Sequence, residues 1–139
     1  MRFTPVRRGK GAIASARHRA EVWPQILRRA GYVCEACGQS TVIEWSHLLG
    51  RGSTGLRLGD AWANLPECGA ALCRPCHRSI DLALDLELRT ALRWTAYWRL
   101  AHRFGIFADP ELADTSPEDA IRALVRHLED KGKTPEEGK

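Results

Sequence analysis

The chain has 139 residues, of which 44% are hydrophobic and 27% charged, and its formal net charge is +4. These values are ordinary for one globular domain with an adequate core. No apolar run approaches the roughly 20 residues that span a bilayer, and no apolar segment follows the basic N-terminus, which argues against a membrane or secreted protein. We therefore expect a cytoplasmic location and reduced thiols.

The positive charge is concentrated at the N-terminal end. Residues 1–30 hold eight Lys and Arg against one acidic residue, residues 31–80 are balanced, and residues 81–139 hold nine basic and twelve acidic residues. An uneven basic balance favours contact with a polyanion such as nucleic acid. A solvated basic tail would give the same count, so charge alone leaves both interpretations open.

The first half of the chain predicts one helix and one strand. Residues 18–30 have a helical apolar pattern, but Pro24 is tolerated only near a helix start, so we expect the ordered helix to begin around Trp23. A short β-type run follows at 41–45, and His47 comes just after it.

The middle of the chain predicts a loop, a second strand and a second helix. Residues 50–60 are rich in glycine and read as loop. A strand is expected near 70–72, and residues 74–80 then open a helix that carries His77.

Two further helices are expected in the C-terminal part. Leucine and tryptophan recur at three- and four-residue steps between 82 and 103, and Ser116-Pro117 followed by two acids is a helix-start signal. The expected layout is a flexible basic arm at 1–16, a single domain at 17–130 with its core at 31–82 and a helical part at 83–130, and a disordered tail at 131–139.

The five cysteines predict a structural zinc site. Cys34 and Cys37 form one CxxC pair, Cys73 and Cys76 form another, and 35 residues separate the pairs. Two such pairs supply the four thiolates that Zn²⁺ binds tetrahedrally, with no position open for a substrate. Cys68 could replace one ligand, although we expect it to be a buried free thiol. His77 could likewise replace Cys76.

The residues between and beside the two pairs resemble a known family. The sequence reads CxxC…SHLLGRG…NL…CxxCH, and it is preceded by WPQILRRAGYVCEACG. This pattern is similar to the HNH endonucleases, in the zinc-stapled variant of phage and bacterial proteins, over about residues 17–82. The resemblance implies an α+β fold with a small ββα-metal core and a zinc-stapled knuckle, flanked by one N-terminal and two C-terminal helices.

The resemblance also implies roles for individual residues. His47 matches the general base, Asn64 the residue that braces it, and His77 a ligand of a catalytic divalent metal. Asp81 lies one helical turn after His77 and could share that ion. Many relatives carry Asp or His where this chain has Ser46, a poor ligand, so the metal would depend more on the other groups.

The implied reaction is hydrolysis of DNA phosphodiester bonds, by nicking or by double-strand cutting. Mg²⁺ or Mn²⁺ fits the catalytic role, and an imidazole ligand also admits Zn²⁺ or Ni²⁺. Candidate phosphate contacts are Arg7, Arg8, Arg51, Arg57, Arg74 and Arg78, each of which could equally be plain surface charge.

Two other functions stay open. One is a non-catalytic zinc-stabilised module that binds DNA on the same scaffold. The other is an adaptor in a larger phage DNA-processing assembly such as DNA packaging, with the acidic helical tail as a docking element. The expected setting is the cytoplasm of a bacterium or a phage-infected host, and a homodimer is compatible with the apolar faces of the C-terminal helices.

Overall fold

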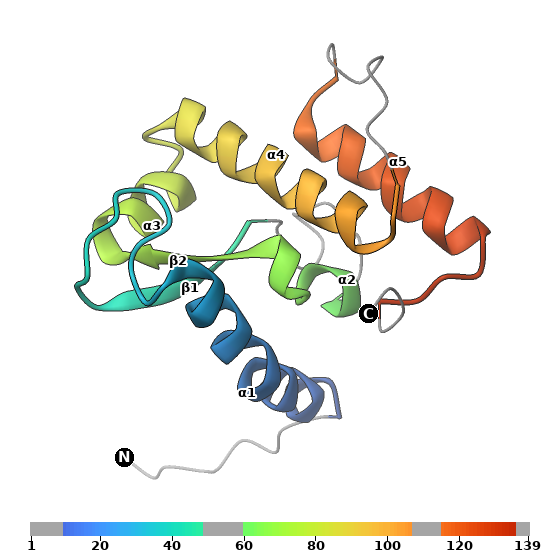
Figure 1. Cartoon of the computed structure of the whole chain (residues 1–139), viewed down its shortest axis with the longest axis horizontal. Helices are drawn as coiled ribbons and strands as arrows, with labels where there is room; N and C mark the ends of the chain where they lie inside the picture. The colour runs from blue at the N-terminus through green and yellow to red at the C-terminus, as the bar shows by residue number, and fades with distance from the viewer. Residues whose placement is uncertain (1–9, 49–59, 107–114, 136–139) are drawn as a thin grey trace, which may run out of the picture.

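A computed structural model describes residues 10–48, 60–106 and 115–135. Within these ranges the chain is mixed α+β, with helices packed around one small antiparallel sheet (Figure 1). In chain order the elements are α1 (Lys10–Ala30), β1 (Ile43–His47), α2 (Asp60–Ala63), the 3₁₀ helix η2 (Pro66–Cys68), β2 (Gly69–Cys73), α3 (Arg74–Asp81), α4 (Leu86–Arg103) and α5 (Pro117–Asp130). No described helix is both long enough and apolar enough to cross a membrane.

The sheet consists of β1 and β2, paired antiparallel with Ile43 opposite Cys73 and His47 opposite Gly69. Its two faces pack against different parts of the molecule, because successive strand residues point to opposite sides. Trp45 and Ala71 face α1, whereas the alternate residues face the C-terminal helices. The second strand confirms the expectation for 70–72. The first strand lies at 43–47 instead of 41–45, so that His47 is its last residue.

Helix α1 begins at Lys10, and our expectation of a start near Trp23 was wrong. Pro24 lies inside the helix and is accommodated there. Val22 and Ile26, on either side of it, are buried against β1, and Trp23 stacks on Trp45 with ring centroids 6.1 Å apart. This packing stabilises the helix across a residue that local propensity alone would place at a boundary. Part of the expected arm at 1–16 is thus helical, and residues 1–9 lie outside the described ranges.

The helix expected from 82 to 103 is α4, and it begins four residues later than the apolar spacing indicates. Helix α3 ends at Asp81, and α4 starts after Asp85, whose side chain accepts a hydrogen bond from the Leu88 backbone N–H at 3.0 Å. Between them Ala83 adopts a left-handed conformation with φ of 53°. Because the apolar spacing continues across this turn, the periodicity placed the start of α4 too early.

Helix α5 has the start that the sequence predicts. The Ser116 side chain accepts a hydrogen bond from the Asp119 backbone N–H, and Pro117 is in the first turn. The apolar face of α5 packs on α4, and both contribute to the main core with Leu72 and Leu48 from the sheet region. Residues 131–135 follow α5, and the Pro135 carbonyl accepts a hydrogen bond from Arg103, whereas 136–139 of the expected tail lie outside the described residues.

Close packing at the start of β2 requires a glycine. A Cβ at Gly69 would lie 2.6 Å from Trp45 Nε1 and 3.0 Å from Ile26 Cδ1. Neither neighbour can withdraw easily, because both side chains are buried. Gly69 therefore lets α1 lie close to the sheet beside His47.

Candidate functional site

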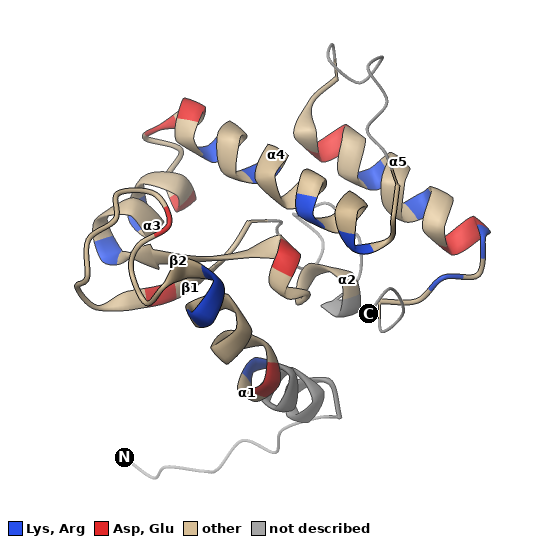
Figure 2. Cartoon of the chain, in the orientation of Figure 1, with Lys and Arg blue, Asp and Glu red and all other residues tan. Residues whose placement is uncertain are grey.

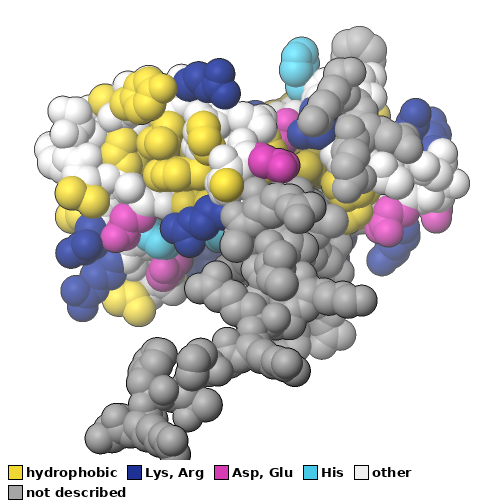
Figure 3. Space-filling model, turned by 90° about the horizontal axis from the view of Figure 1, so that it is seen from below, with side chains coloured by type: hydrophobic (Ala, Val, Ile, Leu, Met, Phe, Trp, Pro, Cys, Tyr) yellow, Lys and Arg dark blue, Asp and Glu magenta, His cyan; other side chains and the backbone are white. Residues whose placement is uncertain are grey.

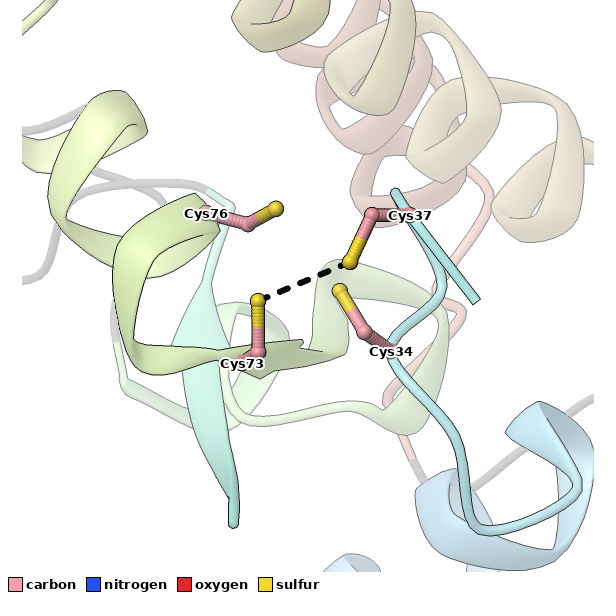
Figure 4. A group of neighbouring side chains, drawn as sticks. All are labelled: Cys34, Cys37, Cys73 and Cys76. Atoms are coloured by element: carbon pink, nitrogen blue, oxygen red, sulfur yellow. Dashed lines mark hydrogen bonds between the residues drawn. The ribbon is translucent and has the colours of Figure 1, made fainter. Parts of the chain in front are cut away.

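The two CxxC pairs come together at one end of the sheet. Cys34 and Cys37 lie in the turn after α1, Cys73 ends β2, and Cys76 lies in the first turn of α3. Their four Sγ atoms lie within 4.8 Å of one another and point toward a common centre (Figure 4). The Cys37 and Cys73 sulfurs are 3.7 Å apart. A tetrahedral ion with sulfur at about 2.3 Å sets its ligands about 3.8 Å apart, so the cluster has the dimensions of a structural zinc site.

Backbone hydrogen bonds shape the knuckle, by which we mean residues 31–39. The Gly38 N–H donates to the Cys34 carbonyl at 2.8 Å, and Gly38 has a φ of 77°, which favours glycine. The Glu35 N–H donates to the Ala71 carbonyl, also at 2.8 Å. The second of these bonds attaches the knuckle to β2, so that the first sulfur pair is held near the second.

The thiols respond to burial and to one another. Burial opposes ionisation of Cys34, but backbone N–H groups of Cys73, Cys37 and Ala36 that bond to its sulfur lower its pKa to about 6. The pKa of Cys76 is raised, first by burial and then by the neighbouring thiols. Four thiolates at this spacing repel one another, and a divalent cation at their centre would supply the compensating charge.

Neither alternative zinc ligand belongs to this cluster. Cys68 is fully buried, and desolvation raises its pKa to about 12, as expected for a buried free thiol. The ring nitrogens of His77 lie beside Glu44 and Asp81 instead of the sulfur cluster. The described residues therefore give the four-sulfur set that the spacing predicts.

His47 and Asn64 form the second feature of the site. The His47 Nε2 lies 3.0 Å from Asn64 Oδ1, and Asn64 is buried in the turn after α2. Because a carboxamide oxygen can only accept, the His47 Nε2–H donates, and in the neutral ring the lone pair is on Nδ1. The ring also stacks on Trp45, with centroids 4.7 Å apart. The asparagine thus fixes the tautomer and orientation of the imidazole.

His77 has a carboxylate beside each ring nitrogen. Its Nδ1 is 3.0 Å from Glu44 Oε1, and its Nε2 is 3.2 Å from Asp81 Oδ2. Asp81 lies on the same helix face, as the four-residue spacing predicts. The pKa of Glu44 is lowered, chiefly by the His77 hydrogen bond and, against some desolvation, by Arg74.

The sequence analysis did not single out Glu44. The signal that could have found it is strand alternation: Glu44 precedes Ser46 by two residues and so shares its side of β1. An acidic residue on that side of β1 lies near the first turn of α3, which carries His77.

The two histidines start on opposite faces of the sheet. His77 reaches β1 through Glu44, whereas His47, three residues later on an extended strand, shares the other face with Trp45. Within the described residues β1 pairs with β2 along one edge only.

Ser46 occupies the position where the HNH pattern often has a ligand. Its side chain is fully buried, and its Oγ has no hydrogen-bond partner among the described residues. A neutral hydroxyl there cannot supply the charge of a carboxylate.

Of the six arginines singled out from the sequence as phosphate contacts, two lie within the described residues. Arg74 and Arg78 are exposed on α3, and Arg74 Nε lies 3.3 Å from Glu44 Oε2. Arg7, Arg8, Arg51 and Arg57 lie outside the described residues. Seen from below, hydrophobic side chains gather on one half of the molecule, with Lys, Arg, acidic and histidine side chains at their edge (Figure 3).

Comparisons of the chain with models of protein families, with curated proteins and with solved structures find no match.

Proposed function

We propose that the chain is a metal-dependent HNH endonuclease that hydrolyses DNA phosphodiester bonds. The observation that carries the proposal is the 3.0 Å contact between His47 and Asn64, because it joins two residues 17 positions apart that only the HNH pattern relates. The order of β1, β2 and α3, with the sulfur cluster at the end of β2, supports a ββα-metal core in the same region.

In this mechanism His47 is the general base. With Nε2–H held by Asn64, Nδ1 is the atom that takes a proton from the attacking water, and an imidazole suits this task near neutral pH. Stacking on Trp45 limits rotation of the ring. The chain therefore presents one nitrogen in one direction, which general-base catalysis requires.

His77 and Asp81 are the residues that would hold the catalytic divalent ion. Glu44 accepts from Nδ1–H of His77, so Nε2 keeps a lone pair for a metal, and Asp81 lies 3.2 Å from that nitrogen. An ion bound there would polarise the phosphate and stabilise the leaving 3′-oxygen. In this proposal the two groups act on one phosphodiester, His47 on the attacking water and the ion on the phosphate and the leaving oxygen.

Nicking of supercoiled plasmid tests the proposal. The full-length protein should relax the plasmid with Mg²⁺, Mn²⁺ or Ni²⁺, and His47→Ala should lower the rate at least about 100-fold because the base contributes roughly that much. His127→Ala is the matched control, since His127 is exposed on α5. Equal zinc content of all three proteins would show that the variants are folded. A wild-type rate that His47→Ala does not change would contradict the proposal.

A second candidate is a non-catalytic DNA-binding module on the same scaffold. Ser46 favours it, since a buried neutral hydroxyl replaces a usual ligand. DNA retardation without cutting in any of the three metals would support this candidate over the first. If the protein neither cuts nor retards DNA, the remaining candidate is an adaptor in a phage DNA-processing assembly.

A further inference from the structure

A pocket of about 400 Å³ lies between α1, η2 and α4. It is lined by Gln25, Arg29, Pro66, Glu67, Arg99, His102 and Arg103. A volume in this range is typical of small-molecule sites. Figure 2 shows basic positions at the C-terminal end of α1 and along α4, the two helices that supply its arginines.

Two of the three arginines have carboxylate partners that hold them in place. Arg29 binds both oxygens of Glu35, at 2.8 and 3.1 Å, and donates to two backbone carbonyls. Arg103 binds both oxygens of Glu67, at 3.1 and 3.2 Å. Arg29 uses two nitrogens and so forms a bidentate pair, whereas Arg103 contacts both Glu67 oxygens through Nη1 alone; each pair neutralises one positive charge.

Arg99 is the most weakly paired of the three arginines. Its Nη1 is 3.9 Å from Glu35 Oε2, beyond hydrogen-bond distance. Glu35 is already engaged by Arg29 and by the Ala71 N–H. The pocket thus has three guanidinium groups for two carboxylates, which leaves one positive charge.

The environment of Arg99 makes this charge costly. Desolvation and the nearby positive charge of Arg29 lower the pKa of its guanidinium, and the negative charges of Glu35 and Glu67 oppose this only in part. A bound anion would stabilise such a group, because it would balance the positive charge and accept hydrogen bonds from the guanidinium. The exposed His102 at the same pocket adds a ring N–H donor.

We propose that this pocket binds a phosphate group, with Arg99 as its principal ligand. A guanidinium presents a fork of N–H donors that matches two phosphate oxygens, and the net positive charge of three arginines against two carboxylates suits an anion. The phosphate would belong either to a DNA backbone or to a free phosphorylated small molecule. Only the DNA source rests on the proposed function.

The position of the pocket makes a DNA phosphate a reasonable source. Arg29 donates to the carbonyl of Gly69, which is the strand partner of His47. The pocket therefore adjoins the end of the sheet where the proposed base lies. A phosphate held there would position a strand without reading its sequence.

The test uses the full-length protein and two probes. The first is inorganic phosphate, titrated calorimetrically at constant ionic strength. The second is a fluorescent DNA duplex, whose affinity is measured by anisotropy as a function of salt concentration. Arg99→Gln should weaken binding of phosphate about tenfold or more, because it removes a charged hydrogen-bond donor. Arg126→Gln, an exposed position on α5, is the matched control and should change nothing.

The two probes distinguish the two sources. If a DNA phosphate occupies the pocket, Arg99→Gln should reduce the slope of log K against log salt by about 0.9, and Arg99→Lys should restore most of that slope. If the ligand is a free phosphate, Arg99→Gln should abolish its binding and leave DNA affinity unchanged. Folding is checked by the thermal transition and zinc content.

If Arg99→Gln bound both inorganic phosphate and the DNA duplex with the same affinity and salt dependence as wild type, the inference would be overturned. Failure of the nuclease proposal would look different, because plasmid cutting would be absent while phosphate binding still depended on Arg99.

Discussion

At the scale of single residues, Glu44 gives the proposed metal site its orientation. Its carboxylate accepts a hydrogen bond from His77 Nδ1 at 3.0 Å, and Arg74 holds its other oxygen. Carboxylates in this position fix the tautomer of a metal-binding histidine and increase its basicity. In the proposed mechanism Glu44 is therefore a positioning residue, which would act on the divalent ion through His77.

Replacing Glu44 tests this role. Glu44→Gln keeps the shape but removes the charge, so we expect affinity for Mn²⁺ to fall about 10- to 100-fold. The measurement is the nicking rate against Mn²⁺ concentration: saturating metal should recover most of the rate, which loss of fold would not allow. Glu87→Gln, an exposed acid in the first turn of α4, is the control. An unchanged Mn²⁺ dependence would show that Glu44 only pairs with Arg74.

At the scale of elements, the knuckle has little stability of its own. It has no regular helix or strand, and its order rests on a few backbone bonds and on the sulfur cluster. In such a segment the free energy of metal binding becomes free energy of folding.

Cys37 offers a clean test of the zinc ligands because it is exposed. Wild-type protein should contain about one zinc per chain, and its Co²⁺ form should show thiolate charge-transfer absorption. Cys37→Ser should lose most of the metal. Cys68→Ala should keep it, although removing a buried group costs roughly 1–2 kcal/mol of stability. Native protein without zinc and with all four thiols open to alkylation would rule out the site.

The elements also show what a sequence can and cannot predict here. The four zinc-ligand cysteines, His77 and Ser116 each belong to a short local motif whose chemistry predicts a structure: a metal knuckle, a helix that carries His77, or a helix N-cap. The structure has these residues where the motifs predict them. The start of α1 and the helix α2 depend on packing against distant residues, which no local window contains. Glu44 was missed for the same reason: its partner is 33 positions away.

The contact between His47 and Asn64 is an instructive intermediate case. The resemblance related these residues, but their separation in the sequence gives no physical reason for contact. The structure supplies this reason, because His47 is the last residue of β1 and Asn64 lies in the segment that leads into β2. Antiparallel pairing then brings the two chain segments together.

At the scale of the whole molecule, Arg93 connects the sheet region to both C-terminal helices. From α4 its Nε donates to the Leu48 carbonyl at 2.9 Å, and its Nη1 pairs with Glu118 in the first turn of α5. Leu48 follows His47 directly, so this arginine also helps to fix the segment that leaves the candidate base. Both partners are at least two-thirds buried, which makes the pair stronger than an exposed one.

The pair with Arg93 predicts a pH-dependent stability. Burial opposes ionisation of Glu118, but a backbone N–H and Arg93 outweigh it and hold its pKa below the ordinary value of 4.5. A carboxyl whose pKa is lowered by folding stabilises the protein above its unfolded value, and this stabilisation is lost as the pH falls through the folded value. Glu118→Gln should therefore lower the free energy of unfolding by about 1 kcal/mol at neutral pH, or the melting temperature by roughly 3–5 °C.

The size of this difference should depend on pH in one direction only. The gap between wild type and Glu118→Gln should be constant at pH values above the ordinary pKa of 4.5 and should close as the pH falls below it and through the lowered pKa of the folded protein, where wild type loses its charge. Glu129→Gln, at the exposed end of α5, should not show this closing gap. Thermal melts of the three proteins across this range are the measurement. A gap that stays the same in acid would mean that Glu118 acts through packing, and that Arg93 holds α5 to the sheet region by shape instead of charge.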